Sequence, residues 1–215
     1  MWLCLLAGCS GTAQAGEMSP ADIQEFWAQM TSYQATLQIT FVSNRSSNTY
    51  TVRQQVLMSG PYRMEVLAPE ECRGVLTICD GEKTMQKDPS IGMTVEASET
   101  PVRSVLFLQE FWQQYLQSPA AAMLGGALRV NAPVYEGIRA PEKVEPEDGE
   151  YVLETELSGG HEKLAVQRLW VNAQDGYPKR MEIYDTEGML SIRVDYIEFQ
   201  PNVEMDTSLF TIEKE

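Results

Sequence analysis

The sequence contains little histidine and cysteine. Its 215 residues include one histidine, His161, and four cysteines. No cluster of these residues has the spacing of a metal site, and no Gly-X-Ser-X-Gly motif, histidine–cysteine pair or phosphate-binding glycine loop occurs. His161 follows Gly159-Gly160 and has the sequence context of an ordinary loop residue. The sequence therefore predicts a protein that is not an enzyme and that holds no metal or cofactor.

Basic residues are also few. Lys and Arg total 16 against 31 Asp and Glu, which gives a formal net charge of −15. This charge repels the phosphates of nucleic acids and disfavours direct adsorption to anionic lipid, whereas it attracts a basic partner surface. We therefore expect no nucleic-acid partner.

Long hydrophobic runs are missing as well. No stretch approaches the ~20 uninterrupted apolar residues of a membrane-spanning helix. The short run Trp2–Leu6 leads into Leu6-Ala7-Gly8-Cys9, which resembles a bacterial lipobox. In a lipobox a signal peptidase cuts before the cysteine, whose sulfur carries a lipid. This interpretation places the protein on the extracytoplasmic face of the cell membrane, anchored through Cys9.

The lipobox divides the chain into three parts. Residues 1–8 are the expected signal peptide, 9–18 the lipidated tether, and 19–215 a single domain. The signal is at the short end of the usual range and has no Lys or Arg, which favours a true start upstream of Met1. The alternative is an accidental match at the start of a soluble protein.

The two remaining cysteines are Cys72 and Cys79. Seven residues of extended chain span roughly 20 Å, whereas a disulfide needs Cα atoms within about 7 Å. A bridge would require a turn at Gly74. The spacing favours two unpaired and mostly buried thiols.

An amphipathic helix is expected to begin at Ser19. Ser19 suits the N-cap, Pro20 the first helical position and Asp22 the third. The helix is expected to end near Thr31 and to pack on a sheet. Its apolar stripe consists of Ile23, Phe26, Trp27 and Met30.

Alternating apolar and polar residues predict a long antiparallel meander. The first strand turns one set of side chains inward: Tyr33, Ala35, Leu37, Ile39 and Phe41. Asp80-Gly81 is a strong hairpin signal. Further strands are expected near residues 50–58, 62–66, 74–80, 84–87, 93–96, 151–157, 164–172, 180–185 and 190–199.

Other segments interrupt this pattern. Val102–Gln117 is predicted as one broadly apolar helix, followed by a connector of small residues at Ala120–Gly126. Residues 132–149 form an expected solvated acidic loop, and the tail is expected to return Leu209 and Phe210 to the body.

About nine or ten antiparallel strands and two amphipathic helices make a single α+β domain, mainly of antiparallel β structure. Strand twist prevents so long a meander from remaining flat. We therefore predict a strongly curved, incomplete β-barrel whose concave side is covered by the two helices.

Several phrases of the sequence resemble the LolA-like superfamily of bacterial envelope proteins. The phrases are Ser32–Leu37, Leu57–Met64, Val75–Lys83, Trp170–Ile183 and Leu209–Ile212. Together they extend the resemblance over nearly the whole mature chain. Soluble carriers of this superfamily place a lid-holding arginine before the proline that corresponds to Pro61, whereas this chain has Gly60.

A lipobox with an acidic LolA-like body is similar to the spore lipoproteins of Firmicutes, which include the germination lipoprotein GerS of clostridia. This resemblance implies a non-enzymatic protein that binds and supports a cortex cell-wall amidase during sporulation or germination. It also implies that the protein forms a homodimer.

Two other interpretations stay open. The concave face could be a cavity for an acyl chain, which would make the protein a carrier or sensor of lipids or lipoproteins, or it could be an ordinary core. The residues expected there are Leu37, Ile39, Phe41, Val52, Met64, Trp112 and Tyr196. Protein binding through an open sheet edge is the other class. Arg103, Arg139 and the acidic residues 142–150 could contribute to recognition or be ordinary surface.

Overall fold

The computed structural model describes residues 16–43, 45–98, 100–118, 121–125, 128–129, 138–139, 141–142 and 146–211. The expected lipidation site Cys9, the signal peptide and most of the tether lie outside the described residues. Much of the expected acidic loop lies outside them too. These expectations stay predictions.

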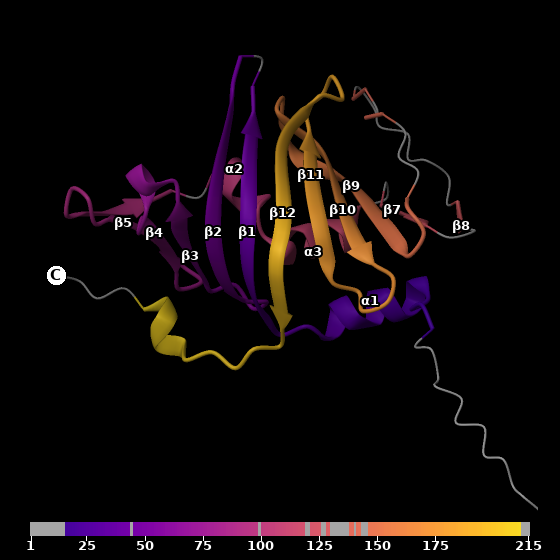
Figure 1. Cartoon of the computed structure of the whole chain (residues 1–215), viewed down its shortest axis with the longest axis horizontal. Coiled ribbons are helices and arrows are strands. Elements are labelled where there is room, and N and C mark those ends of the chain that lie inside the picture. Colours follow the sequence, from indigo (N-terminus) through magenta and orange to yellow (C-terminus); the bar gives the residue numbers. More distant parts are fainter. Residues whose placement is uncertain are drawn as a thin grey trace, which may run out of the picture.

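Helix α1 (Pro20–Gln29) begins as the sequence predicts. Ser19 is the N-cap, and its hydroxyl accepts a hydrogen bond from the backbone N–H of Asp22, whose carboxylate accepts one from the N–H of Ser19. This reciprocal pair is a capping box. Ile23 and Trp27 are buried, and the Trp27 indole donates to the carbonyl of Gly176 at 3.1 Å. The helix is thereby fixed to one end of the sheet (Figure 1).

The described strands form one antiparallel sheet of twelve strands in the order β6-β5-β4-β3-β2-β1-β12-β11-β10-β9-β7-β8. The first half comprises β1 (Ser32–Val42), β2 (Ser47–Leu57), β3 (Tyr62–Ala68), β4 (Leu76–Cys79), β5 (Thr84–Asp88) and β6 (Met93–Ala97). The second half comprises β7 (Ala122–Gly125), β8 (Leu128–Arg129), β9 (Glu150–His161), β10 (Leu164–Asn172), β11 (Pro178–Tyr184) and β12 (Leu190–Pro201). The sheet curves around its helices without closing, so the predicted incomplete barrel is confirmed (Figure 1).

The first and last long strands meet at the centre of the sheet. Phe41 pairs with Ile192 and Leu37 with Tyr196, and the register shifts between Thr36 and Leu37. The inward set of β1 lies against the core as predicted, with Leu37 fully buried. The two halves of the meander therefore share one apolar interior.

Glycine is required at the turn between β2 and β3. Gly60 has φ +135°, a backbone conformation that side-chain-bearing residues rarely adopt. Its N–H donates to the carbonyl of Leu57 at 3.0 Å and closes the turn. Gly60 thus has a backbone role in this chain.

The prediction of one helix over Val102–Gln117 is wrong. The structure has a short helix α2 (Pro101–Ser104) and a second helix α3 (Leu108–Gln117), separated by Val105–Phe107, which we call the plug segment. Phe107 is extended, with φ −108° and ψ +136°. The plug segment is buried, and two side chains from the sheet donate to its carbonyl groups. These hydrogen bonds stabilise a non-helical backbone that the local apolar pattern does not indicate.

The predicted connector at Ala120–Gly126 is also wrong in part. Strand β7 occupies Ala122–Gly125 and pairs with β9, with Met123 opposite Leu153. The sheet consequently has more strands than the sequence suggested. Within the described residues, no helix combines the length and the hydrophobicity that crossing a membrane requires.

The two cysteines and the tail lie close to expectation. Cys72 and Cys79 are unpaired; Cys79 is buried, while Cys72 is half-buried at the end of a short 3-10 helix, η1 (Glu70–Cys72). A second 3-10 helix, η2 (Thr207–Phe210), returns the tail to the body and buries Phe210.

Candidate functional site

The structure brings the seven predicted concave-face residues into one apolar cluster. Four are buried in the core and three are half-buried and packed against it. The buried ones are Leu37, Ile39, Val52 and Trp112, and the half-buried ones are Phe41, Met64 and Tyr196. Burial raises the pKa of the Tyr196 phenol well above its ordinary value. Their use by a ligand stays a prediction.

Helix α3 covers this cluster with aromatic rings. Trp112 lies 6.0 Å from Trp27 of α1 and 5.6 Å from Tyr115, between ring centroids. The plug segment adds Phe107, whose ring lies 4.2 Å from that of Tyr62 on β3. Such aromatic pairs contribute about 0.5–1.5 kcal/mol each beyond the burial of their area. The concave side is therefore occupied by side chains of α1, the plug segment and α3.

A buried polar network joins the plug segment to β1 and β2. Gln54 is fully buried, and its Nε2 donates to the carbonyl of Leu106 at 3.2 Å. Its Oε1 accepts from the Tyr33 hydroxyl at 3.2 Å, and that hydroxyl accepts from the N–H of Leu108 at 3.3 Å. Burial raises the pKa of Tyr33, which keeps the phenol neutral and able to donate.

A second glutamine holds the same segment from the other half of the sheet. Gln167 on β10 is fully buried, and its Nε2 donates to the carbonyl of Val105 at 2.8 Å. Sequence analysis missed both glutamines. The sequence did contain an indication for Gln54, because alternation along β2 places it on the inward face together with Val52 and Val56. A buried amide costs free energy unless it is hydrogen-bonded, so a glutamine on an inward face indicates a backbone partner.

Charged residues form a row across the opposite face of β9–β12. Glu154, Arg168, Glu182 and Arg193 are direct cross-strand partners in successive strands. Arg168 and Glu154 form a buried ion pair, and Arg168 also donates to the carbonyl of Glu142 at 2.8 Å. Opposite charges alternate along this row, which indicates a role in pairing the strands.

Aromatic rings flank this row. The Arg168 guanidinium lies 5.1 Å from the ring centroid of Tyr184, and the Arg180 guanidinium 4.1 Å from that of Trp170. Burial, followed by the hydrogen bond and charge of Glu182, raises the pKa of Tyr184. The described residues hold no group of three or more His, Cys, Asp or Glu arranged for a metal ion.

His161, which was expected to be an ordinary loop residue, ends β9, is exposed, and accepts a hydrogen bond at Nδ1 from the N–H of Lys163. The residues considered for recognition lie at separate places. Arg103 lies in α2 and donates to the carbonyl of Ser98 at 3.0 Å. The N–H of Arg139 donates to the carbonyl of Thr186 at 2.9 Å. The structure therefore does not gather Arg103 and Arg139 into one site.

Strand β6 ends the sheet on one side, and we call its free side the β6 edge. Met93 and Val95 of this strand are exposed by 48% and 39%, and Ile91 in the turn before it is exposed by 64%. Only β5 pairs with β6 among the described strands. The β6 edge thus combines unpaired backbone groups with exposed apolar side chains.

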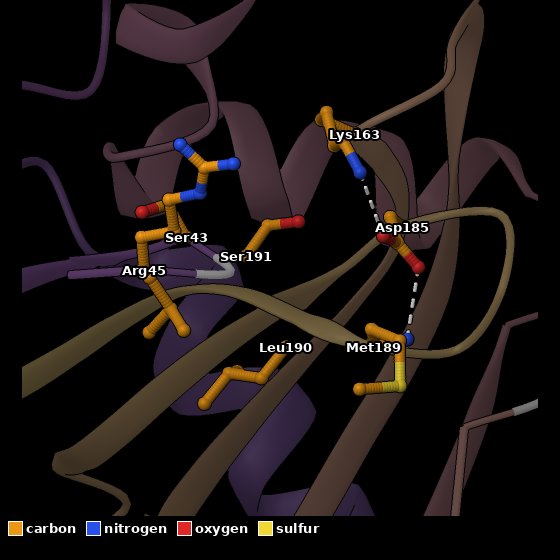
Figure 2. A pocket seen from close by; sticks show the side chains of 8 residues that line it. Ser43, Arg45, Lys163, Asp185, Met189, Leu190 and Ser191 are labelled. Carbon is orange, nitrogen blue, oxygen red and sulfur yellow. Dashed lines mark hydrogen bonds and ion pairs between the residues drawn. The ribbon is translucent and has the colours of Figure 1, made fainter. Parts of the chain in front are cut away.

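Two of the pockets that described residues line are considered for binding, and none of the seven concave-face residues lines either one. A polar pocket of about 330 Å³ lies on the outer face of β1–β3 and includes Arg53, Glu65 and Glu198. The second, of about 640 Å³, is called the rim pocket here. It is lined by Val42, Ser43, Arg45, Lys163, Asp185, Met189, Leu190 and Ser191 (Figure 2).

Comparison with known proteins gives a family match over part of the chain. Residues 135–210, which contain β9–β12, match the model of the YdcC-like sporulation proteins. No curated protein sequence matches the chain.

Solved structures with a similar fold cover most of the chain. One is an uncharacterized conserved protein from Thermus thermophilus, with 16% identity and a TM-score of 0.52 over 91% of this chain and 94% of that one. A chain in the structure of the CwlD amidase from Clostridioides difficile in complex with the GerS lipoprotein matches with 26% identity and a TM-score of 0.49, over 84% of this chain and 92% of that one. A LolA superfamily protein from Nitrosomonas europaea matches with 15% identity and a TM-score of 0.43, over 91% and 98%. The matched structures thus include a LolA superfamily protein and a complex that contains GerS.

Proposed function

We propose that this chain is a non-enzymatic envelope protein of sporulating bacteria that binds a cell-wall amidase at the β6 edge and is tethered to the membrane by lipid on Cys9. The match of residues 135–210 to a sporulation family supports the setting. The observation that carries the binding role is the β6 edge itself, with Met93 and Val95 exposed beside unpaired backbone.

The physical argument rests on what an open edge can do. An edge strand presents free N–H and C=O groups that can pair with an extended segment of another chain, while its side chains supply apolar contacts. Proteins commonly protect such edges with Lys, Pro or bulges. Strand β6 has the sequence Met-Thr-Val-Glu-Ala and carries neither Lys nor Pro. The net charge of −15 further favours a partner with a basic surface.

Binding to purified cell-wall amidases from the same genome tests the proposal. We expect the Val95→Lys variant to bind the amidase at least about tenfold more weakly, because it places a charge in the apolar contact. The matched control is Leu116→Lys, which alters an apolar side chain exposed by 63% on α3. Equal binding by the wild type and Val95→Lys would remove the β6 edge from the proposal. Absence of binding to every amidase would overturn the proposal that a cell-wall amidase is the partner.

The anchor has a separate test. Cells expressing the protein with its natural upstream sequence are labelled with radioactive palmitate, and the Cys9→Ala variant is labelled in parallel. We expect label in the wild type alone. Label that persists in Cys9→Ala would contradict the lipobox.

A second candidate function is a carrier or sensor of lipids that uses the concave apolar cluster. The gathering of seven apolar residues on one concave face favours it. Organic extraction of the natively purified protein distinguishes the two functions. Stoichiometric lipid in the extract would favour the carrier, and a lipid-free protein that binds an amidase would favour the partner.

A further inference from the structure

The rim pocket lies where three connections between strands meet. Ser43 and Arg45 come from the turn between β1 and β2, and Lys163 from the turn between β9 and β10. Asp185 and Met189 come from the turn between β11 and β12, and the start of β12 completes the lining. This end of the strands is opposite to α1, because β1 begins directly after α1 and reaches the pocket at Val42 (Figure 1). The pocket is therefore separate from the β6 edge and from the concave-face cluster.

The charges of the rim pocket oppose those of the protein as a whole. Arg45 and Lys163 stand against a single carboxylate, Asp185, in a chain of net charge −15. Figure 2 shows Arg45 on one side of the pocket and Lys163 with Asp185 on the other. The pocket thus carries an excess of one positive charge.

The single carboxylate is already engaged. Asp185 is buried and accepts hydrogen bonds from the Lys163 ammonium at 3.2 Å and from the N–H groups of Glu187 and Met189 at 3.0 and 2.9 Å. An ammonium has three donors, so Lys163 keeps donors for another acceptor. Arg45 has no ion pair among the described residues, which leaves its guanidinium available.

The remaining surface of the pocket is largely apolar. Val42, Met189 and Leu190 form it, and Val42 and Met189 are exposed by 39% and 66%. A volume of about 640 Å³ falls within the range of small-molecule sites, which combine an apolar lining with a few polar groups that orient the ligand.

We propose that the rim pocket binds a small organic anion: a carboxylate or phosphate group on a short alkyl chain. The anionic group lies between Arg45 and Lys163, and the alkyl chain lies on Val42, Met189 and Leu190. Ser191 lines the same pocket and supplies a hydroxyl donor, whereas the Ser43 hydroxyl donates to the carbonyl of Ser46 at 2.9 Å. Charge complementarity favours the anionic group and the apolar lining favours the chain.

Isothermal titration with alkyl probes tests both parts of this ligand. We expect octanoate and octyl phosphate to bind, and octanol and octylammonium to bind at least about tenfold more weakly. Affinity is expected to rise by up to about fourfold for each CH₂ between butanoate and octanoate. Equal binding of octanol and octanoate would overturn the role of the cations. Equal binding of inorganic phosphate and octyl phosphate would overturn the role of the apolar surface.

Variants then locate the site. The double variant Arg45→Gln/Lys163→Gln is expected to lose at least about tenfold in affinity for octyl phosphate. The matched control is Lys83→Gln, which removes one positive charge from the exposed turn after β4. In methyl NMR, the Met189 signal is expected to shift with octyl phosphate while that of Met93 on β6 stays in place. An unchanged Met189 signal, or unchanged affinity of the double variant, would overturn the proposal.

Vesicles distinguish a free ligand from a lipid headgroup in a bilayer. The probes are vesicles of phosphatidylglycerol mixed with phosphatidylcholine, and monomeric octyl phosphate is titrated in parallel. We expect octyl phosphate to bind whether or not the protein sediments with vesicles. Sedimentation without binding of octyl phosphate would overturn the small-anion site. Neither result depends on an amidase, so this inference and the proposed function can fail separately.

Discussion

Gln167 Nε2 donates to the carbonyl oxygen of Val105 at 2.8 Å, and this contact joins the middle of β10 to the break between α2 and α3. From the other half of the sheet, Gln54 makes the equivalent contact to Leu106. Two strands that are distant in sequence therefore hold one short buried segment. The helices on the concave side are positioned by these amides as well as by apolar packing.

Replacing Gln167 by Leu tests the strength of this contact. The variant leaves the buried Val105 carbonyl without its side-chain donor, so we expect the free energy of unfolding to fall by about 1–3 kcal/mol. Urea denaturation followed by tryptophan fluorescence measures the change. Gln38→Leu, at an exposed position on β1, serves as the control and should change stability by less than about 0.5 kcal/mol. Equal effects of the two substitutions would contradict the role of Gln167.

Shortening a buried side chain of the plug segment should lower the free energy of unfolding more than the loss of one hydrogen bond does. Phe107 is 1% exposed and packs on Tyr62, so Phe107→Ala is expected to destabilise the protein by about 3–5 kcal/mol. The comparison variant is Leu116→Ala on α3, where the side chain is exposed and a small effect is expected. A loss below about 1 kcal/mol for Phe107→Ala would mean that the segment is not part of the cooperative core.

The buried pair of Arg168 and Glu154 makes a prediction about non-additivity. Replacing Arg168 alone by Leu leaves a buried carboxylate and is expected to cost about 3–5 kcal/mol. Adding Glu154→Leu should recover a large part of that loss, because the buried carboxylate that has lost Arg168 is then removed as well. A double-mutant cycle in urea measures the coupling. Simple addition of the two losses would argue against the pair as a unit.

The capping box of α1 predicts a dependence on pH. The hydrogen bonds from the hydroxyl and the N–H of Ser19 lower the pKa of Asp22. A depressed pKa in the folded state stabilises the protein above the unfolded pKa, and this contribution disappears as pH falls through the folded pKa. The wild type should therefore exceed Asp22→Asn in stability at pH 7 and lose that advantage as the pH falls through the lowered pKa of Asp22. A difference between the two proteins that is independent of pH would contradict the assignment.

The elements of the fold were predicted correctly where hydrophobic periodicity and local sequence signals agree. The N-cap at Ser19, the alternation of β1 and the Asp80-Gly81 turn depend on neighbours within a few residues, and all are found in the structure. The break between α2 and α3 depends on Gln54 and Gln167, which are distant along the chain. Its apolar residues also fit a helix, so local pattern alone gave one helix.

The candidate site shows the same division. The seven concave-face residues were identifiable because they alternate with polar ones or follow a helical stripe, and they do lie together. A strand near residues 93–96 and binding through an open sheet edge were expected, but which strand would be left at the edge was not identifiable. The rim pocket was not identifiable either, because it arises from turns that come together only when the sheet curves. Strand β7 likewise owes its conformation to pairing with β9.

The pairing of β1 with β12 affects how the chain can be made. A ribosome synthesises Phe41 early, but its partner Ile192 emerges only after nearly all of the other strands. Until then the apolar side of β1 lacks its central neighbour, and contacts between such distant segments form slowly. We therefore expect the central pairing of the sheet to be completed only when synthesis is almost finished.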